Sequence, residues 1–260
     1  MLWNEFVFKR ATVPQLAKKY SRSVHWVRKE LRAYEPLTVE VVPCDIVAVV
    51  DCVFFGRSSG YLVVRDPLRK RNIYWSEIAR ESLDEYRCAR DTLESMGFVI
   101  KAVVADGKPG LKRLYDDVPA QMCHFHQKAI VTRHLTTRPR LEAGIELRGL
   151  THSLCDAKEE AFAQGLAEWY VKWRMFLAEK TTNPETGKWS YTHKRLRAAY
   201  RSLKTNLRYL FSYQRYPELG IPNTTNGLEG SFAHLKELVK LHRGIKQDLK
   251  KKMIESILQK

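Results

Sequence analysis

Three acidic side chains stand in settings where they could hold metal ions. Asp51 lies inside the apolar run 45–55, and Asp106 ends a second apolar run. Glu229 follows residue types that cap the start of a helix. An all-oxygen set of carboxylates suits Mg²⁺ or Mn²⁺, and two such ions can stabilise the attacking and leaving oxygens of a phosphodiester. The three residues are therefore candidates for a two-metal site that acts on phosphodiesters.

The run around Asp51 predicts a strand that is buried on both faces. It is rich in valine and phenylalanine and is bounded by Pro43 and Gly56. An ionised aspartate in such a strand is costly unless a cation meets it; alternatively, Asp51 lies at a bend and caps a backbone group. The second run repeats the pattern, because Asp106 ends it just before a helical segment, residues 111–117. Carboxylates at the ends of strands point into the crevice where open α/β sheets bind ligands. This repetition favours the metal site.

The composition indicates a globular protein with a polyanionic partner. The chain has 260 residues, of which 44% are hydrophobic and 28% charged, so it can bury a core in one large domain with an appendage, or in two domains. Lys and Arg number 45 against 29 Asp and Glu, which gives a formal charge of +16. Because neutralised phosphates release counterions, this excess favours nucleic acid. The alternative is a basic protein without such a partner.

The sequence predicts a cytoplasmic protein, associated with the nucleoid if it binds DNA. No apolar run approaches the roughly 20 residues of a membrane helix, and the first residues lack the basic start and apolar stretch of a signal peptide. An odd number of cysteines without a CxxC pair indicates reduced thiols. The five are Cys44, Cys52, Cys88, Cys123 and Cys155.

Residues 11–34 predict two short helices joined by a tight turn. Thr12 can cap the first helix and Pro14 falls in its first turn, while the second begins near Ser23. The residues expected to point inward from the second helix are Val24, Val27 and Leu31. The residues expected to face outward, or to flank the contact between the two helices, are His25, Trp26, Arg28, Lys29 and Arg32. A basic second helix favours a helix-turn-helix that reads DNA, although any αα-hairpin would give the same pattern.

Residues 39–125 predict a compact α/β unit. Strands at 60–67 and 72–75 follow the Asp51 strand with short connections, which favours antiparallel pairing. A helix from Ser76 to Met96 then leads to the Asp106 strand. Three strands, a helix, a strand with a second acid and another helix are the order of an RNase H-like core.

A helical insertion is expected before Glu229, because the gap from Asp106 to Glu229 is too long for one strand and one helix. Residues 156–178 and 193–211 each place apolar side chains on one helical face, and the turn-rich segment 181–187 separates them. The helical spacing favours a core position for Trp169 and Trp173 over stacking on DNA bases. The tryptophan outside that spacing, Trp189, is the candidate for DNA contact.

Cys123 and His126 have the CxxH spacing of zinc ligands. A structural zinc site needs four ligands, and no second pair stands out. We therefore interpret the two residues as supporting the active site, with zinc binding, or donation from His126 to a phosphate, as alternatives.

The helix that carries Glu229 also carries basic residues along nearly the same stripe. Lys236 and Lys240 follow Glu229 by seven and eleven residues, which would place cations beside DNA phosphates. The alternative for Lys236 is a solvated surface lysine. Residues 246–260 repeat the charge bias and predict a helix that lies on DNA or is exposed.

Taken together, the motifs resemble a known family. The order Val49-Val-Asp51, Val103-Val-Ala-Asp106-Gly107, Gln121-Met-Cys123-His-Phe-His126 and Asn223-Thr-Thr-Asn-Gly-Leu-Glu229 resembles DDE transposases of the Mutator-related class of bacterial insertion sequences. The resemblance covers nearly the whole chain. It departs from the family at the N-terminus, because the zinc ribbon that many relatives carry is absent: no cysteine precedes residue 44.

The resemblance implies a fold and a mechanism. The fold class is α/β: residues 40–149 and 217–260 would form an RNase H-like mixed sheet, 150–216 an all-α insertion and 1–36 a helix-turn-helix. Asp51, Asp106 and Glu229 would be the catalytic, metal-binding triad with two Mg²⁺ or Mn²⁺ ions. The protein would bind the terminal inverted repeats of an insertion sequence, and it would cleave and transfer strands as a homodimer on double-stranded DNA, both the transposon ends and the target.

Two other functions fit the same sequence. An inactive or domesticated transposase would keep the fold and act as a DNA-binding regulator, and a nuclease or resolvase would cleave without joining strands. The presence of all three acids favours catalysis.

Overall fold

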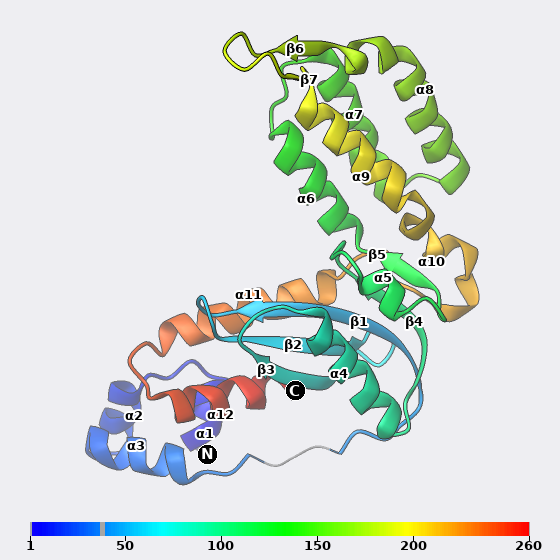
Figure 1. Ribbon diagram of the computed structural model, residues 1–260. Coiled ribbons are helices and arrows are strands. Elements are labelled where there is room, and N and C mark those ends of the chain that lie inside the picture. Colours follow the sequence, from blue (N-terminus) through cyan, green and yellow to red (C-terminus); the bar gives the residue numbers. More distant parts are fainter. Residues whose placement is uncertain (1, 37–39, 260) are drawn as a thin grey trace. The chain divides into compact units, whose positions relative to one another are not determined.

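The computed structural model describes residues 2–36 and 40–259, and its fold is mixed α/β with a five-stranded mixed sheet and many helices. The boundary expected between the helix-turn-helix, which ends at residue 36, and the sheet domain, which begins at residue 40, falls outside the described residues. The chain divides into two compact units. The first combines the residues up to Val99 with those from Asn226 onward, and the second comprises Ile100–Thr225. Figure 1 labels their helices and strands.

The first unit contains three consecutive antiparallel strands. They are β1 (Asp45–Phe54), β2 (Gly60–Asp66) and β3 (Arg71–Ile78). In the ladder, Asp51 lies opposite Val63, and Val63 lies opposite Trp75. The five residues from Ile46 to Val50 are all buried, which confirms the prediction of a strand covered on both faces up to Asp51.

The helix predicted from Ser76 begins seven residues later. Ser76 and Ile78 belong to β3, where they pair with Leu62 and Gly60. This pairing satisfies backbone groups that a helix would otherwise have to bond within itself. Helix α4 (Leu83–Ser95) instead starts after Ser82, whose hydroxyl accepts a hydrogen bond from Glu85 N at 3.3 Å.

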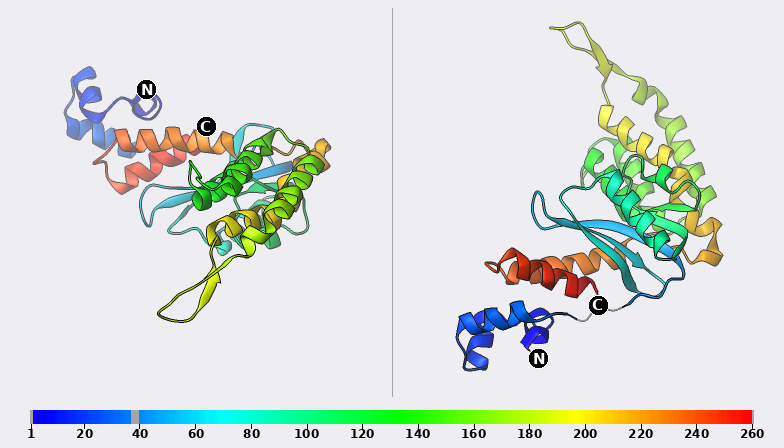
Figure 2. Two further views of the ribbon diagram at one scale, coloured as in Figure 1. Left: turned by 90° about the horizontal axis from the view of Figure 1, so that it is seen from above. Right: turned by 60° about the horizontal axis from the view of Figure 1, so that its bottom comes forward.

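The predicted N-terminal helices are present, but their core includes the C-terminal helix. Helices α1 (Leu2–Val7) and α3 (Val24–Ala33) contact α12 (Gln247–Leu258), and α2 (Val13–Lys19) contacts α1 and α3. Figure 2 shows these helices beside one another. Their shared core includes Trp3, Phe6, Leu16, Val27, Leu31, Leu249 and Met253. The C-terminal helix is therefore not simply exposed, because its apolar face completes this core.

Helix α11 (Asn226–Leu241) starts where the sequence predicted a cap. Its buried face consists of Leu228, Phe232, Leu235 and Leu238, and it contacts β1. Helix α11 thereby brings the segment that carries Glu229 onto the strand that carries Asp51.

The second unit begins at Ile100, the second residue of β4 (Val99–Ala105). Strand β4 pairs in parallel with β5 (Ala120–Met122). The helix predicted at 111–117 is shorter, because α5 spans only Leu111–Leu114. Gly110 precedes α5 with φ of 89°, a left-handed conformation that glycine adopts without strain.

Helices form the rest of the second unit. They are α6 (His124–Leu135), α7 (Glu142–His152), α8 (Glu159–Ala178), α9 (Lys194–Leu210) and α10 (Ser212–Arg215), with 3₁₀ turns at Ser153–Cys155 and Pro217–Leu219. The helices predicted at 156–178 and 193–211 are confirmed as α8 and α9. One core, which includes Val131, Leu147, Phe162, Leu166, Leu203 and Phe211, joins α6 and α7 to them.

A short hairpin joins α8 to α9 where the sequence predicted only turns. It consists of β6 (Lys180–Thr182) and β7 (Trp189–Tyr191), which pair antiparallel. The described helices include none that is both long and apolar enough to cross a membrane.

Candidate functional site

Asp51 lies within β1 of the first unit and is half-buried. Its Oδ1 atom accepts a hydrogen bond from Cys52 N at 2.7 Å. The carboxylate therefore does bind a backbone group, as the alternative interpretation required. However, β1 continues past Asp51 and the residue is not at a bend. The hydrogen bond to Cys52 orients the side chain without ending the strand.

Glu229 lies in the first turn of α11, and it is half-buried. A negative charge at this end of a helix is stabilised by the unpaired backbone N–H groups. The start of α11 lies close to the sheet, because a Cβ added at Gly227 would come 3.8 Å from Arg65 Nε. Arg65 is itself the ladder partner of Val49, two residues before Asp51. Two of the three predicted acids thus come from neighbouring elements of one unit.

Asp106 follows β4 directly and belongs to the second unit. It is half-buried, and its Oδ1 atom accepts a hydrogen bond from Lys108 N at 2.9 Å, an arrangement typical of an Asx turn. The turn holds the carboxylate at the carboxyl end of a strand, as the sequence predicted.

Lys112 shares a small cavity with Asp106 and was not among the residues predicted from the sequence. Its ammonium donates to Asn206 Oδ1 and lies 4.0 Å from the centre of the Tyr209 ring. Burial, with a smaller contribution from Arg208, lowers the pKa of Lys112 to about 8. No local pattern distinguishes Lys112 from the other lysines, because Asn206 and Tyr209 are far away in the sequence.

Cys123 and His126 lie together at the start of α6. Cys123 is fully buried at the N-cap position, and its Sγ atom lies 3.3 Å from both the backbone N and the Oγ1 of Thr225. Burial raises the pKa of Cys123, but hydrogen bonds from His126 and Thr225 outweigh it, so the pKa lies below its ordinary value. A further bond joins His124 N to Asn223 O at 2.9 Å. These contacts tie α6 to the segment just before Asn226.

His124, between the two, has a structural role. It is fully buried, and its Nε2 atom lies 2.6 Å from Leu210 O. Because a carbonyl only accepts, Nε2 carries the proton. The ring also meets Phe211 and Tyr213 edge to face. His124 therefore links the start of α6 to the end of α9.

The predicted DNA-contacting residues of α3 have different surroundings. His25, Arg28 and Lys29 are exposed. Trp26 is half-buried against the core of the N-terminal helices, and Arg32 forms an ion pair with Asp248 of α12 at 3.6 Å. The exposed side of α3 is therefore narrower than the sequence suggested.

Val24 does not point inward as predicted, because it remains 37% exposed. It is the first residue of α3, directly after the cap Ser23, whose hydroxyl accepts from Trp26 N. The first turn of α3 thus extends beyond the core, which only Val27 and Leu31 reach from this face.

The tryptophans behave as their spacing predicted. Trp169 is buried and its indole N–H donates to Ala143 O at 2.9 Å, while Trp173 packs at the edge of the same core and donates to Glu146 Oε2. Trp189 is 55% exposed in β7, with Lys180 Nζ 3.9 Å from its ring centre. It remains available for a ligand.

We expect acid to destabilise the protein partly through His242. Burial lowers the pKa of His242, a shift that a hydrogen bond to the backbone of Phe6 partly offsets. The unfolded chain, with a histidine pKa of about 6.5, therefore takes up the proton first. This contribution to stability is complete above pH 6.5 and is lost as the pH falls.

The measurement is urea unfolding of the wild type and of His242→Phe at pH 7.5, 6.5 and 5.5. Phe keeps a ring against Phe6, whose centre lies 4.1 Å from that of His242. The wild type should lose more unfolding free energy than the variant, by at most about 1.4 kcal/mol per pH unit. Equal losses would contradict the role of His242.

Neither the comparison with protein-family models nor the comparison with curated proteins yields a match for this chain.

Proposed function

We propose that the chain is a DDE transposase with an RNase H-like catalytic core. The observation that carries the proposal is the placement of acids on the sheet: Asp51 within a buried strand and Asp106 at the end of a second. Glu229 adds a third acid on a helix that contacts the first of these strands. Three antiparallel strands, a helix and a parallel strand pair, in this chain order, support the fold.

The three carboxylates suit a pair of Mg²⁺ or Mn²⁺ ions. All three are half-buried, and backbone N–H groups orient Asp51 and Asp106. Bound there, two ions would activate a water or a 3′-hydroxyl and stabilise the leaving oxygen of a phosphodiester. The proposal requires Asp106 of the second unit to act together with Asp51 and Glu229 of the first. Cys123 and His126 would support this site by fixing the segment that leads into α11.

The exposed residues of α3 would bind the terminal inverted repeats of the element. The protein would act as a homodimer on paired DNA ends. We expect Arg28→Ala and Lys29→Ala each to weaken binding of duplex DNA. Each lost phosphate contact should reduce the slope of log K against log salt by about 0.9. The matched control is Lys9→Ala, an exposed lysine outside α3. Unchanged salt slopes for both α3 variants would remove α3 from the DNA interface.

The experiment that tests the function is cleavage of a duplex that carries the element's own end, with purified protein and Mg²⁺. The proposal expects a product with a 3′-hydroxyl at that end, and strand transfer when target DNA is added. Specific binding without cleavage in Mg²⁺ or Mn²⁺ would contradict catalysis. The basic surface of α3 would then support a DNA-binding regulator.

A further inference from the structure

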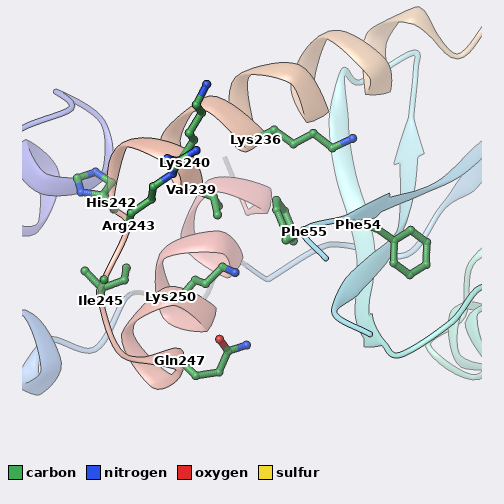
Figure 3. Close-up of a pocket in the computed structure, with 11 residues that line it drawn as sticks. Phe54, Phe55, Lys236, Val239, Lys240, His242, Arg243, Ile245, Gln247 and Lys250 are labelled. Carbon is green, nitrogen blue, oxygen red and sulfur yellow. The ribbon is translucent and has the colours of Figure 1, made fainter. Parts of the chain in front are cut away.

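A groove lies in the first unit between the end of β1 and the turn that joins α11 to α12. Its volume is about 540 Å³, which is within the range of small-ligand sites. Figure 3 shows the side chains around it. They include Phe55, Lys236, Lys240, Arg243 and Lys250.

The groove is strongly cationic. Four of its lining residues are Lys or Arg, and none is acidic. Among residues 2–36 and 40–259, no carboxylate forms an ion pair with any of these four cations. His242 also lines the wall, but burial lowers its pKa, so it adds no positive charge at neutral pH. The groove therefore favours a ligand with more than one negative charge.

An aromatic ring lies among the cations. Phe55 is half-buried, and Lys250 Nζ lies 5.5 Å from the centre of its ring. Figure 3 shows Phe55 between Lys236 and Lys250, with Phe54 turned away from the basic side chains. Proteins that bind single strands combine an aromatic face, on which a base stacks, with cations that contact the adjoining phosphates.

We propose that this groove binds an unpaired nucleotide of a DNA strand. The base stacks on Phe55, and the phosphates on either side meet Lys236, Lys250 and the two other cations. The identity of the ligand as DNA rests on the proposed function, whereas the preference for an unpaired nucleotide rests on Phe55 and the charges. From the sequence, Lys236 and Lys240 were the only two of these residues expected to contact DNA, through duplex phosphates.

The test is equilibrium binding of the full chain to fluorescent DNA without divalent metal. The probes are a blunt duplex, the same duplex with an unpaired extension, and a single strand of thymidines. Phe55→Leu keeps an apolar side chain but removes the aromatic face. We expect it to weaken binding of the extended duplex and the single strand about tenfold, with little change for the blunt duplex. The salt slope should stay unchanged.

Two matched variants separate the aromatic and charge contributions. Phe54→Leu makes the same change at a ring that lies against Gly60, so its binding should match the wild type. Lys250→Gln should reduce the salt slope on the single strand by about 0.7, whereas Arg80→Gln, an exposed arginine outside the groove, should not. Thermal melts confirm that each variant is folded.

Three outcomes would overturn the proposal. Equal effects of Phe55→Leu and Phe54→Leu on binding would contradict the stacking contact. Equal losses of affinity for the blunt and the extended duplex would contradict the preference for unpaired DNA. Displacement of the single strand by millimolar thymidine monophosphate would assign the groove to free nucleotides. If the expected binding differences are found but the protein does not cleave DNA, the proposed groove stands and the transposase function is contradicted. The two failures are therefore distinguishable.

Discussion

Replacing Asp106 with Asn should abolish metal-dependent cleavage of element-end DNA, with a loss of at least about 10³-fold in rate. The amide removes the charge that would hold the metal ions. Its Oδ1 atom can still accept the hydrogen bond from Lys108 N that shapes the turn. The variant should therefore fold and bind DNA as the wild type does. The measurement is single-turnover cleavage in Mg²⁺ and in Mn²⁺.

Asp116→Asn is the matched control, because Asp116 is an exposed acid of the same unit. It makes the same chemical change and should cleave at the wild-type rate. If Asp106→Asn retains cleavage within tenfold of the wild type, Asp106 does not hold the catalytic metal. A loss in both variants would point to the overall charge of the unit.

Replacing Trp169 with Ala should lower the free energy of unfolding by about 3–5 kcal/mol. The indole is buried in the helical core and stacks against Tyr200, with ring centres 5.4 Å apart. Its removal leaves a cavity and deprives Ala143 O of a hydrogen-bond donor. Urea unfolding monitored by circular dichroism measures the loss.

Trp189→Ala provides the comparison for Trp169. Because Trp189 is largely exposed in β7, its removal should change the free energy of unfolding by no more than about 0.5 kcal/mol. If Trp189→Ala weakens DNA binding and Trp169→Ala does not, the result would support the DNA contact predicted for Trp189. Similar stability losses from both substitutions would contradict the assignment of Trp169 to the core.

The local sequence determined the elements that carry the candidate site. The run before Asp51 is apolar at successive positions, so a strand there has to be buried on both faces, and β1 is buried there. The recurrence of apolar residues at helical spacing likewise predicted α8 and α9. These predictions succeeded because the period of a pattern follows from the geometry of the strand or helix itself.

Tertiary contacts decided the features that no local pattern contains. The continuation of β3 through Ile78 depends on its partner β2, and the burial of α12 depends on helices more than two hundred residues earlier. The low pKa of Lys112 likewise comes from burial against Tyr209 and Asn206. The sequence by itself therefore determined on which elements the candidate residues lie. Only the tertiary structure decided their surroundings, because burial and charge depend on groups brought together from distant parts of the chain.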